Sequence, residues 1–467
     1  MNPGRKTTRR SGLIEGHRRP AAKRFPSEEL KNRSRGTGAH PPTKTPLVPR
    51  EEYTAQLEGL VEIVDLGGKP AFLLKVGTQL VAKPFVARDG VRYLPPPREQ
   101  IPWLLPKEQE VQRWYRKDKD LDLYDALAKE YHPSISKLPT EAHYDLLAAH
   151  DLHTYCLEQV HYSPILIFDG PAEYGKTRTG KGCIHVDYHG FHTESLNEAY
   201  IFRMADRLTA TIFLDVMDLW DKAIKARSED ILLKRYEKGA QVPRVLHPDA
   251  PAYQDIAYFD IFGPTIIATN ESVSHLLATR ALTIHMPYYE GTFTEPTPQL
   301  GLPYKERLVA FRARHMGHPL PDLPKPVPGR LGDIIQPLFQ VLQLVRPDRS
   351  FALLEIVREQ AEFRQDHASS SQEAEIVQAL LGLAGHVQNG LLSVQDITVA
   401  YNGAHGRHLS ERSMGWRLRK LGFPRASIGN NYAAISWDEE VIRRLGRRYG
   451  LLRETPERPE TPATGNP

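Results

Sequence analysis

A run of apolar residues leads directly into a glycine-rich loop that ends in lysine and threonine. The apolar run is Ile165 to Phe168, and the loop has the pattern G-x-x-x-x-G-K-T. Glycines let a backbone wrap a phosphate, so that successive N–H groups and the start of the next helix face the negative charge. The predicted phosphate-binding residues are Gly170, Pro171, Ala172, Glu173, Tyr174, Gly175, Lys176, Thr177 and Arg178.

The last two loop positions supply most of the chemistry. Lys176 can reach the β- and γ-phosphates of a nucleotide, and the Thr177 hydroxyl can ligate Mg²⁺. We therefore expect ATP and Mg²⁺ as cofactors. The pattern also fits a second frame, Gly175 to Lys181, in which Gly182 stands at the position of the threonine. It lacks the hydroxyl and does not follow the strand, so the first frame is favoured.

Two other apolar runs end in polar side chains. Asp215 follows the run 211–214, and Asn270 follows the run 265–269. A carboxylate at the end of a second strand can hold the metal through water, together with Thr177. An amide at a neighbouring strand end can hold the lytic water or the γ-phosphate. The pattern predicts catalytic roles for both residues, with helix capping and turn formation as the alternatives.

The residue that activates water is left open by the sequence. Val216 follows Asp215, so the next position provides no carboxylate that could polarise the attacking water. Hydrolysis needs a group that orients the water. Asp218, Glu194 and Glu271 are the candidates.

An arginine stands just before another apolar run. Arg280 stands just before the strand expected at 283–285, ten residues after Asn270. Such an arginine can reach the nucleotide of a neighbouring subunit, or it can form an ordinary surface ion pair. We expect a catalytic role for Arg280.

The elements that position these residues alternate between strand and helix. Short buried runs at 165–168, 211–215, 265–269 and 283–285 alternate with helical patterns. This order predicts an α/β core with a mainly parallel sheet. We expect a basic disordered arm (1–48), a small β module with a linker (49–106), the core with leading helices (107–300), a helical lid (301–368), a three-helix unit with a hairpin (369–450) and a disordered tail (451–467).

Composition excludes several classes of protein. Hydrophobic residues make up 40% of the 467 residues and charged residues 25%, as in ordinary globular chains. Two cysteines exclude a disulfide scaffold and suit a reducing compartment. No run approaches a membrane helix, and the N-terminus lacks the apolar stretch of a secretory signal. We expect a cytoplasmic protein with no membrane partner.

The basic charge is concentrated at the start of the chain. Residues 1–50 contain 13 Lys and Arg against 3 Asp and Glu. The remaining residues have a small acidic excess. Such an arm suits contact with a phosphate backbone, or it serves as a solvated tail.

Over roughly residues 140–350, the chain resembles an AAA+ ATPase. The resemblance rests on the order of the phosphate loop, the strand ending in Asp215, the strand ending in Asn270, the arginine and the helical lid. Within that group the chain is similar to ATPases of mobile elements and to minichromosome-maintenance-like helicases. The run from Phe262 to Glu271 and the winged-helix-like end support this similarity. The resemblance implies a P-loop AAA+ core, ATP hydrolysis, DNA as partner, and a homo-oligomeric ring for which a hexamer is one candidate.

The resemblance also implies roles for single residues. Asn270 would be sensor-1 and Arg280 an arginine finger. Arg330 would be sensor-2 and bind the nucleotide, with Arg307 and Arg312 as alternatives.

Two basic segments are candidates for contact with nucleic acid. Four basic residues surround a turn between Lys234 and Arg244, and this interval carries channel loops in ring helicases. Lys238 and Arg244 are the predicted contacts, and a solvated face is the alternative. The expected helix Ser410–Leu421 has an apolar face at its Met and Leu positions and carries Arg417, Arg419 and Lys420. A basic third helix is the usual DNA reader of a winged helix, although such units also dock proteins.

A cluster between Cys183 and His192 has mixed ligand types but no second cluster within reach in the sequence, so we do not expect a metal site there. The sequence thus favours an ATP-dependent DNA helicase or translocase for replication of a mobile or viral element. The alternative is a non-helicase AAA+ switch, such as a loader, a transposition regulator or a remodelling ATPase, that binds DNA.

Overall fold

The computed structural model describes residues 50–452, except for 227, 247, 248, 250, 252, 253, 272, 273, 370, 407 and 429–431; it describes 366–369 by their backbone alone. The arm predicted for 1–48, the hairpin turn at Gly429-Asn430 and all but two residues of the predicted tail lie outside the described residues.

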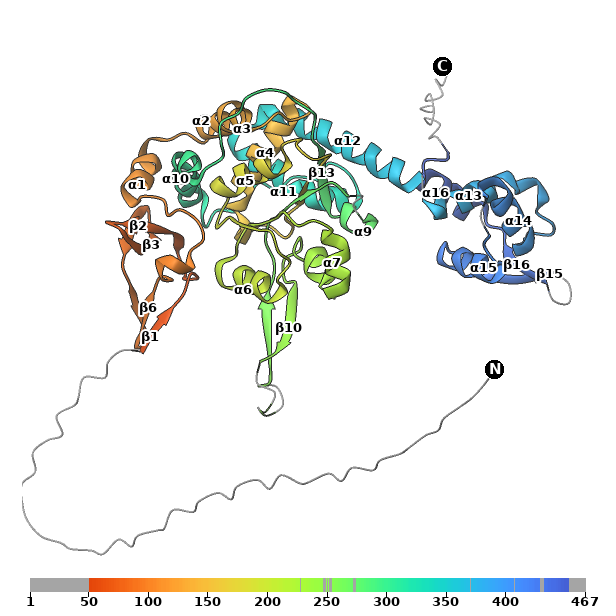
Figure 1. The fold of residues 1–467 in the computed structure, drawn as a ribbon, viewed down its shortest axis with the longest axis horizontal. Helices are drawn as coiled ribbons and strands as arrows, with labels where there is room; N and C mark the ends of the chain where they lie inside the picture. Colours follow the sequence, from red (N-terminus) through yellow and green to blue (C-terminus); the bar gives the residue numbers. More distant parts are fainter. Residues whose placement is uncertain are drawn as a thin grey trace, which may run out of the picture. The chain divides into compact units, whose positions relative to one another are not determined.

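A five-stranded, fully parallel sheet forms the centre of the fold (Figure 1). In spatial order, the strands are β13 (Ala281–His285), β7 (Ile165–Asp169), β12 (Thr265–Thr269), β9 (Ile212–Leu214) and β8 (Phe191–Thr193). Strands β7, β9 and β12 are buried almost throughout, as a parallel sheet covered on both faces requires. The predicted α/β core with a mainly parallel sheet is confirmed.

Most of the remaining chain between residues 108 and 369 is helical. The helices are α1 (Glu108–Lys117), α2 (Asp120–Asp125), α3 (His132–Ile135), α4 (Glu141–Thr154), α5 (Lys176–Val186), α6 (Glu198–Leu208), α7 (Leu219–Ala226), α8 (Glu229–Lys234), α9 (His275–Ala278), α10 (Pro298–His315), α11 (Gly329–Val345) and α12 (Ser350–Ser369). A π-helical segment, Ala126–Tyr131, joins α2 to α3. Helix α5 packs on β7, β9 and β12, and α4 packs on α5, α11 and α12.

The N-terminal strands form two small sheets. The strands are β1 (Arg50–Tyr53), β2 (Leu60–Leu66), β3 (Lys69–Val76), β4 (Gln79–Lys83), β5 (Val86–Arg88) and β6 (Val91–Leu94). Strands β2, β3 and β4 form an antiparallel meander, and β5 pairs antiparallel with β6. Strand β1 adds to β6 in the parallel direction. The apolar core of these strands is continuous with that of the parallel sheet.

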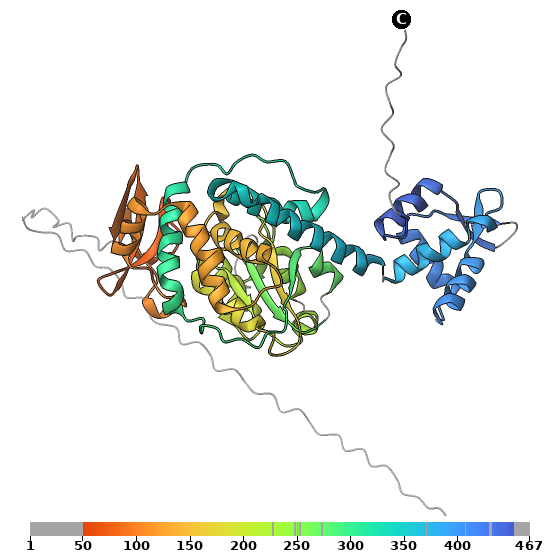
Figure 2. The same ribbon diagram turned by 90° about the horizontal axis from the view of Figure 1, so that it is seen from above.

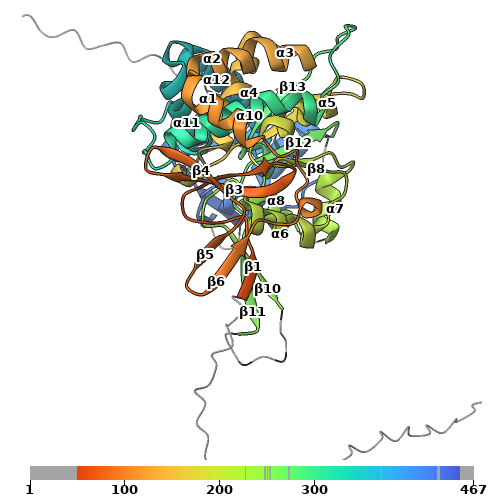
Figure 3. The same ribbon diagram turned by 90° about the vertical axis from the view of Figure 1, so that its left-hand side faces the viewer.

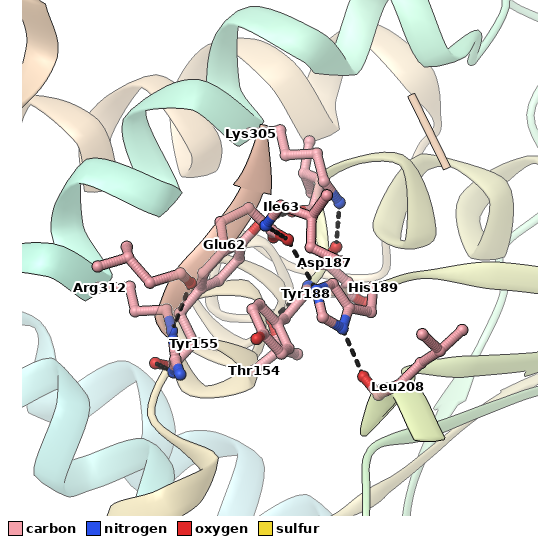
Figure 4. A network of polar contacts seen from close by, with 12 residues as sticks. Glu62, Ile63, Thr154, Tyr155, Asp187, Tyr188, His189, Leu208, Lys305 and Arg312 are labelled. Atoms are coloured by element: carbon pink, nitrogen blue, oxygen red, sulfur yellow. Dashed lines mark hydrogen bonds and ion pairs between the residues drawn. The ribbon is translucent and has the colours of Figure 1, made fainter. Parts of the chain in front are cut away.

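Buried polar contacts join β2 to the rest of the core (Figure 4). Glu62 Oε1 lies 2.7 Å from His189 Nε2, and the two side chains are fully buried. On α10, Arg312 donates from Nε to the Val61 carbonyl at 2.9 Å. Helix α10 lies between the N-terminal strands and α5 (Figure 2). These contacts fix β2 to α10 and to the segment that follows α5.

A long antiparallel hairpin leaves the core between β9 and β12. It consists of β10 (Gln241–Val245) and β11 (Ile256–Asp260). This hairpin and the β5–β6 hairpin extend from the same side of the core (Figure 3). Val245 and Tyr258 are 61% and 63% exposed. The sequence pattern did not predict this hairpin.

The C-terminal unit has a hydrophobic core of its own. Its elements are α13 (Gln372–Gly382), β14 (Leu391–Ser393), α14 (Val394–His405), α15 (Glu411–Lys420), β15 (Arg425–Ile428), β16 (Tyr432–Ser436) and α16 (Glu439–Arg448). The three antiparallel strands have the order β14-β16-β15. The three predicted helices and the hairpin are present, whereas β14 and α16 were not predicted.

Among the helices of the described residues, none combines the length and the apolar character that crossing a membrane would require.

Candidate functional site

The glycine-rich loop turns sharply at the end of β7. Gly175 has φ 83°, in the left-handed region, and it caps the N-terminus of α5. A side chain at this position would strain the backbone. Because α5 begins at Lys176, its free N–H groups point out of the end of the sheet, where an anion can bind.

Two loop side chains make contacts that define the site. The Lys176 ammonium donates to the main-chain carbonyls of Gly170 and Pro171. Desolvation lowers the pKa of Lys176, although the neighbouring carboxylates of Asp169 and Asp215 oppose that shift. The Thr177 hydroxyl donates to Asp215 Oδ2 at 2.8 Å. The loop lysine, the loop threonine and the carboxylate of the second strand are therefore neighbours.

A cavity of about 470 Å³ opens at this end of the sheet. It lies at the carboxyl ends of β7, β9 and β12, which is the usual ligand position in open α/β sheets. The lining residues are Ala172, Glu173, Gly175, Lys176, Thr177, Arg178, Asp215, Val216, Met217, Ala268, Thr269 and Asn270. The structure thus brings together most of the predicted loop residues with Asp215 and Asn270.

The two residues that follow Asp215, the buried Val216 and the exposed Met217, carry no carboxylate. Two of the three candidate acids lie close to each other: Asp218 donates from its backbone N–H to Glu271 Oε1. Desolvation and the nearby Asp218 and Asp221 raise the pKa of Glu271, so this carboxyl holds a proton more readily than usual. The third candidate, Glu194, is exposed just after β8.

Arg280 and Arg330, the predicted arginine finger and sensor-2, do not line this cavity. Arg280 precedes β13, and its carbonyl accepts a hydrogen bond from Ile165 N at the amino end of the sheet. Arg330 donates to Thr279 Oγ1 at 2.9 Å. Desolvation and the charge of Arg330 both lower the pKa of Arg280. The two guanidinium groups therefore lie near each other, at the edge opposite the cavity of the same chain.

The two alternative sensor-2 arginines have internal partners. Arg307 forms two 2.9 Å hydrogen bonds with the Asp118 carboxylate. Arg312 is buried and pairs with Glu158. Both side chains are used in packing α10, which leaves Arg330 as the sensor-2 candidate.

The basic segment between Lys234 and Arg244 is not a loop of free cations. Arg235 is 1% exposed and donates to the Ala210, Ile261 and Pro264 carbonyls. The interpretation as a cluster of four exposed basic residues is wrong for Arg235, because its charge is used inside the fold.

The two predicted contacts in this segment have partners of their own. Lys238 donates to the Glu158 carbonyl at 2.7 Å, and Arg244 pairs with Glu198. Arg244 is half-buried on β10. The alternation of Q-V-P-R-V and I-A-Y-F-D is the sequence signal that could have identified this hairpin.

Helix α15 carries its basic residues outside an apolar face. Met414 and Leu418 are fully buried, as predicted. Arg417 lies 3.5 Å from Glu373, whereas the Lys420 ammonium lies 3.8 Å from the Trp416 ring centroid. Arg419 and Lys420 are exposed. Of the three predicted contacts, Arg417 is the one that already pairs with a carboxylate.

No protein-family model matches the chain, and no curated protein matches its sequence. Several solved structures are similar to it at low identity. The C-terminal region of NrS-1 is 10% identical over 82% of this chain and 97% of that one, with a TM-score of 0.33. SCCmec type IV Cch, described as an active helicase, is 10% identical over 80% and 79%, with a TM-score of 0.35. A full-length MCM homolog from Methanopyrus kandleri is 14% identical over 64% and 75%, with a TM-score of 0.34. Since these scores are low, the assignment of function depends on the geometry described above.

Proposed function

We infer that the protein is an AAA+ ATPase with Mg²⁺ as its metal. One observation carries this proposal: Lys176, Thr177, Asp215 and Asn270 surround one cavity at the carboxyl ends of three adjacent parallel strands. The groups match the needs of phosphoryl transfer, in which the protein positions the phosphates and neutralises their charge.

Each of these residues has a distinct task. The N–H groups at the start of α5 and the Lys176 ammonium would bind the phosphate oxygens. Lys176 donates to the loop carbonyls of Gly170 and Pro171 and would exchange these for phosphate. Thr177 and Asp215 would hold Mg²⁺, which supplies charge neutralisation when bound. Asn270 would hold the attacking water or the γ-phosphate.

Glu271 is the strongest candidate for the general base, because Val216 cannot accept a proton. It follows Asn270 directly, and it is linked to Asp218 in the segment after Asp215. Desolvation and the neighbouring carboxylates raise the pKa of Glu271, which makes it a better proton acceptor than an unperturbed glutamate.

The site is proposed to be shared between subunits. Arg280 and Arg330 lie at the edge of the sheet opposite the cavity. In a head-to-tail ring, this edge of one subunit would face the cavity of the next. Both arginines would then contact the neighbour's nucleotide. A hexamer is one closed form of such a ring.

DNA is the proposed substrate of the motor. The C-terminal unit has the helix and strand order of a winged helix, with Arg419 and Lys420 exposed on its third helix. The β10–β11 hairpin, with Arg244 on β10, is a second candidate contact. These features support a helicase or translocase, and the resemblance seen in the sequence adds replication of a mobile or viral element as its setting.

The test combines three measurements on one preparation. ATP hydrolysis is measured with and without single-stranded DNA, strand separation is followed on a forked duplex, and particles are imaged with nucleotide. Stimulated hydrolysis, strand separation and ring particles are expected. Absence of ATP hydrolysis in folded protein would refute the proposal.

A non-helicase AAA+ switch is the second candidate. Val216, which is buried and provides no carboxylate, favours it, because a slow hydrolytic step suits a switch better than a motor. This function predicts DNA-stimulated hydrolysis without strand separation.

A further inference from the structure

A second group of polar side chains lies deep in the core, away from the loop cavity. His150 and Asp151 come from α4, and Asp187 caps the C-terminus of α5. All three are fully buried. One ligand atom from each lies within 4.8 Å of the other two.

Among the described residues, five side-chain atoms of this group have no hydrogen-bond partner as long as both carboxyl groups are ionised. They are His150 Nδ1 and Nε2, Asp151 Oδ1, and Asp187 Oδ1 and Oδ2. An ionised carboxylate is costly to bury without a partner, so such a group either takes up a proton or binds a cation. His150 Nδ1 lies 3.8 Å from Asp187 Oδ1, which is too far for a hydrogen bond. It is close enough for both atoms to bind one ion after a small shift.

Surrounding contacts hold the Asp151 side chain and the main chain of Asp187. Asp151 Oδ2 lies 2.7 Å from the buried His132 Nε2, so its other oxygen faces Asp187. Lys305 donates to Asp187, but to the main-chain carbonyl at 2.6 Å, so the carboxylate itself is left without this donor. A polar outer shell that fixes the ligands is typical of metal sites in proteins.

We propose that His150, Asp151 and Asp187 bind a divalent transition-metal ion, with Zn²⁺ the best fit. An imidazole nitrogen and carboxylate oxygens are accepted zinc ligands. Asp187 has two unpartnered oxygens, so it can supply two donors and complete four-coordination. Two carboxylates and a neutral imidazole carry two negative charges, which one divalent cation neutralises.

The ion would have a structural task. It would tie α4 to the C-terminus of α5, the helix that begins with Lys176 and Thr177. The site is buried and lies outside the loop cavity, and this inference does not depend on the proposed nucleotide chemistry. The alternative is a proton shared by the two carboxyl groups, as in other close carboxylate pairs.

The first experiment needs no mutation. The full chain is purified without chelators or nucleotide, and its zinc content is measured by elemental mass spectrometry. About one zinc per chain is expected. Treatment with a strong zinc chelator should remove the metal and lower the melting temperature, and added Zn²⁺ should restore it. Folded protein with far less than one metal ion per chain, and a melting temperature unaffected by Zn²⁺, would overturn the proposal and leave the shared proton.

Variants then locate the ion. Asp187→Asn and His150→Ala should lose zinc, and Co²⁺-loaded protein should lose its visible absorption. His132→Ala should weaken zinc binding about 10- to 100-fold, since it removes only an outer contact. His143→Ala is the matched control, because it removes another buried imidazole of α4 outside the cluster. Loss of zinc from His143→Ala but not from Asp187→Asn would place the ion elsewhere and refute the assignment.

Discussion

The Thr177 hydroxyl donates a hydrogen bond to the Asp215 carboxylate, with 2.8 Å between the two oxygens. Thr177 follows the loop after β7, and Asp215 follows β9, with β12 lying between the two strands. The parallel sheet alone brings these residues together. The two proposed Mg²⁺ ligands are therefore positioned by the fold.

The first prediction concerns Lys176. Lys176→Ala removes the positive charge that would meet the β- and γ-phosphates, so ATP hydrolysis should fall about 100-fold or more. The measurement is steady-state phosphate release, with circular dichroism to show that the fold is intact. Lys181→Ala, on the same helix but outside the cavity, is the control and should retain activity. Normal turnover by Lys176→Ala would end the assignment of the phosphate loop.

The second prediction tests the shared site. Mixing Lys176→Ala with Arg280→Ala should restore part of the hydrolysis, because some interfaces then pair an intact loop with an intact arginine. An arginine finger is worth about 10³-fold or more in rate. A mixture of Lys176→Ala and Asp215→Ala is the control and should stay inactive, since both changes affect the same cavity. If subunits exchange and the first mixture is also inactive, Arg280 does not act on a neighbour.

A third prediction assigns the general base. Glu271→Gln should lower kcat by about 10²- to 10⁴-fold, because it removes a proton acceptor, and it should leave KM for ATP nearly unchanged. Glu194→Gln is the control. The reverse result, with a fall in kcat only in Glu194→Gln, would move the role to that residue.

The fourth prediction concerns DNA binding by α15. The structure leaves Arg419 and Lys420 exposed, whereas Arg417 is near Glu373. Changing Arg419 and Lys420 to Ala should weaken DNA binding. It should also flatten the plot of log affinity against log salt by ~0.9 for each phosphate of duplex DNA that the variant no longer neutralises.

The control for this experiment is Arg443→Ala with Arg444→Ala. These residues are exposed on α16 and change the net charge of the unit equally. Equal effects of the two double variants would mean that α15 has no specific role. The C-terminal unit would then be better interpreted as a docking module for a protein.

The fifth prediction is a dependence of stability on pH. Burial raises the pKa of Glu62, but the charge and hydrogen bond of His189 and the charge of Lys305 outweigh this, so the net pKa lies below its ordinary value of 4.5. Since the folded pKa is lowered, the stabilisation is present above 4.5. It is lost as pH falls through the folded pKa.

Glu62→Gln should therefore lower the melting temperature at neutral pH, because breaking a buried pair costs about 3–5 kcal/mol. Its melting temperature should also change less than that of the wild type below pH 4.5. Glu58→Gln, at an exposed position near the same strands, is the control. The prediction would be contradicted if the melting temperatures of Glu62→Gln and the wild type changed equally with pH.

The sequence predicts the strands that carry the site because each is a continuous apolar run with a polar end. Strand β8 escapes prediction because Phe191, His192 and Thr193 have no such pattern. The β10–β11 hairpin was missed because the charges between Lys234 and Arg244 suggested an exposed loop.

Contacts between distant parts of the chain lay beyond sequence reasoning. The Arg235 guanidinium donates hydrogen bonds to main-chain carbonyls. The positions of these carbonyls depend on the fold and cannot be predicted from a pattern of side chains. Similarly, Glu62 and His189 are 127 positions apart. The positions of Arg280 and Arg330 at the edge opposite the cavity also required the three-dimensional sheet.

The contact between Glu62 and His189 limits how far the chain can be shortened from its N-terminal side. A fragment that begins after the N-terminal strands would leave Lys305 and Arg312 of α10 without the nearby Glu62 carboxylate and the Val61 carbonyl. It would also expose the apolar surface on which β2 packs. A fragment that keeps the parallel sheet folded therefore has to retain β2, and the N-terminal strands are a structural part of this core that cannot be removed as an accessory.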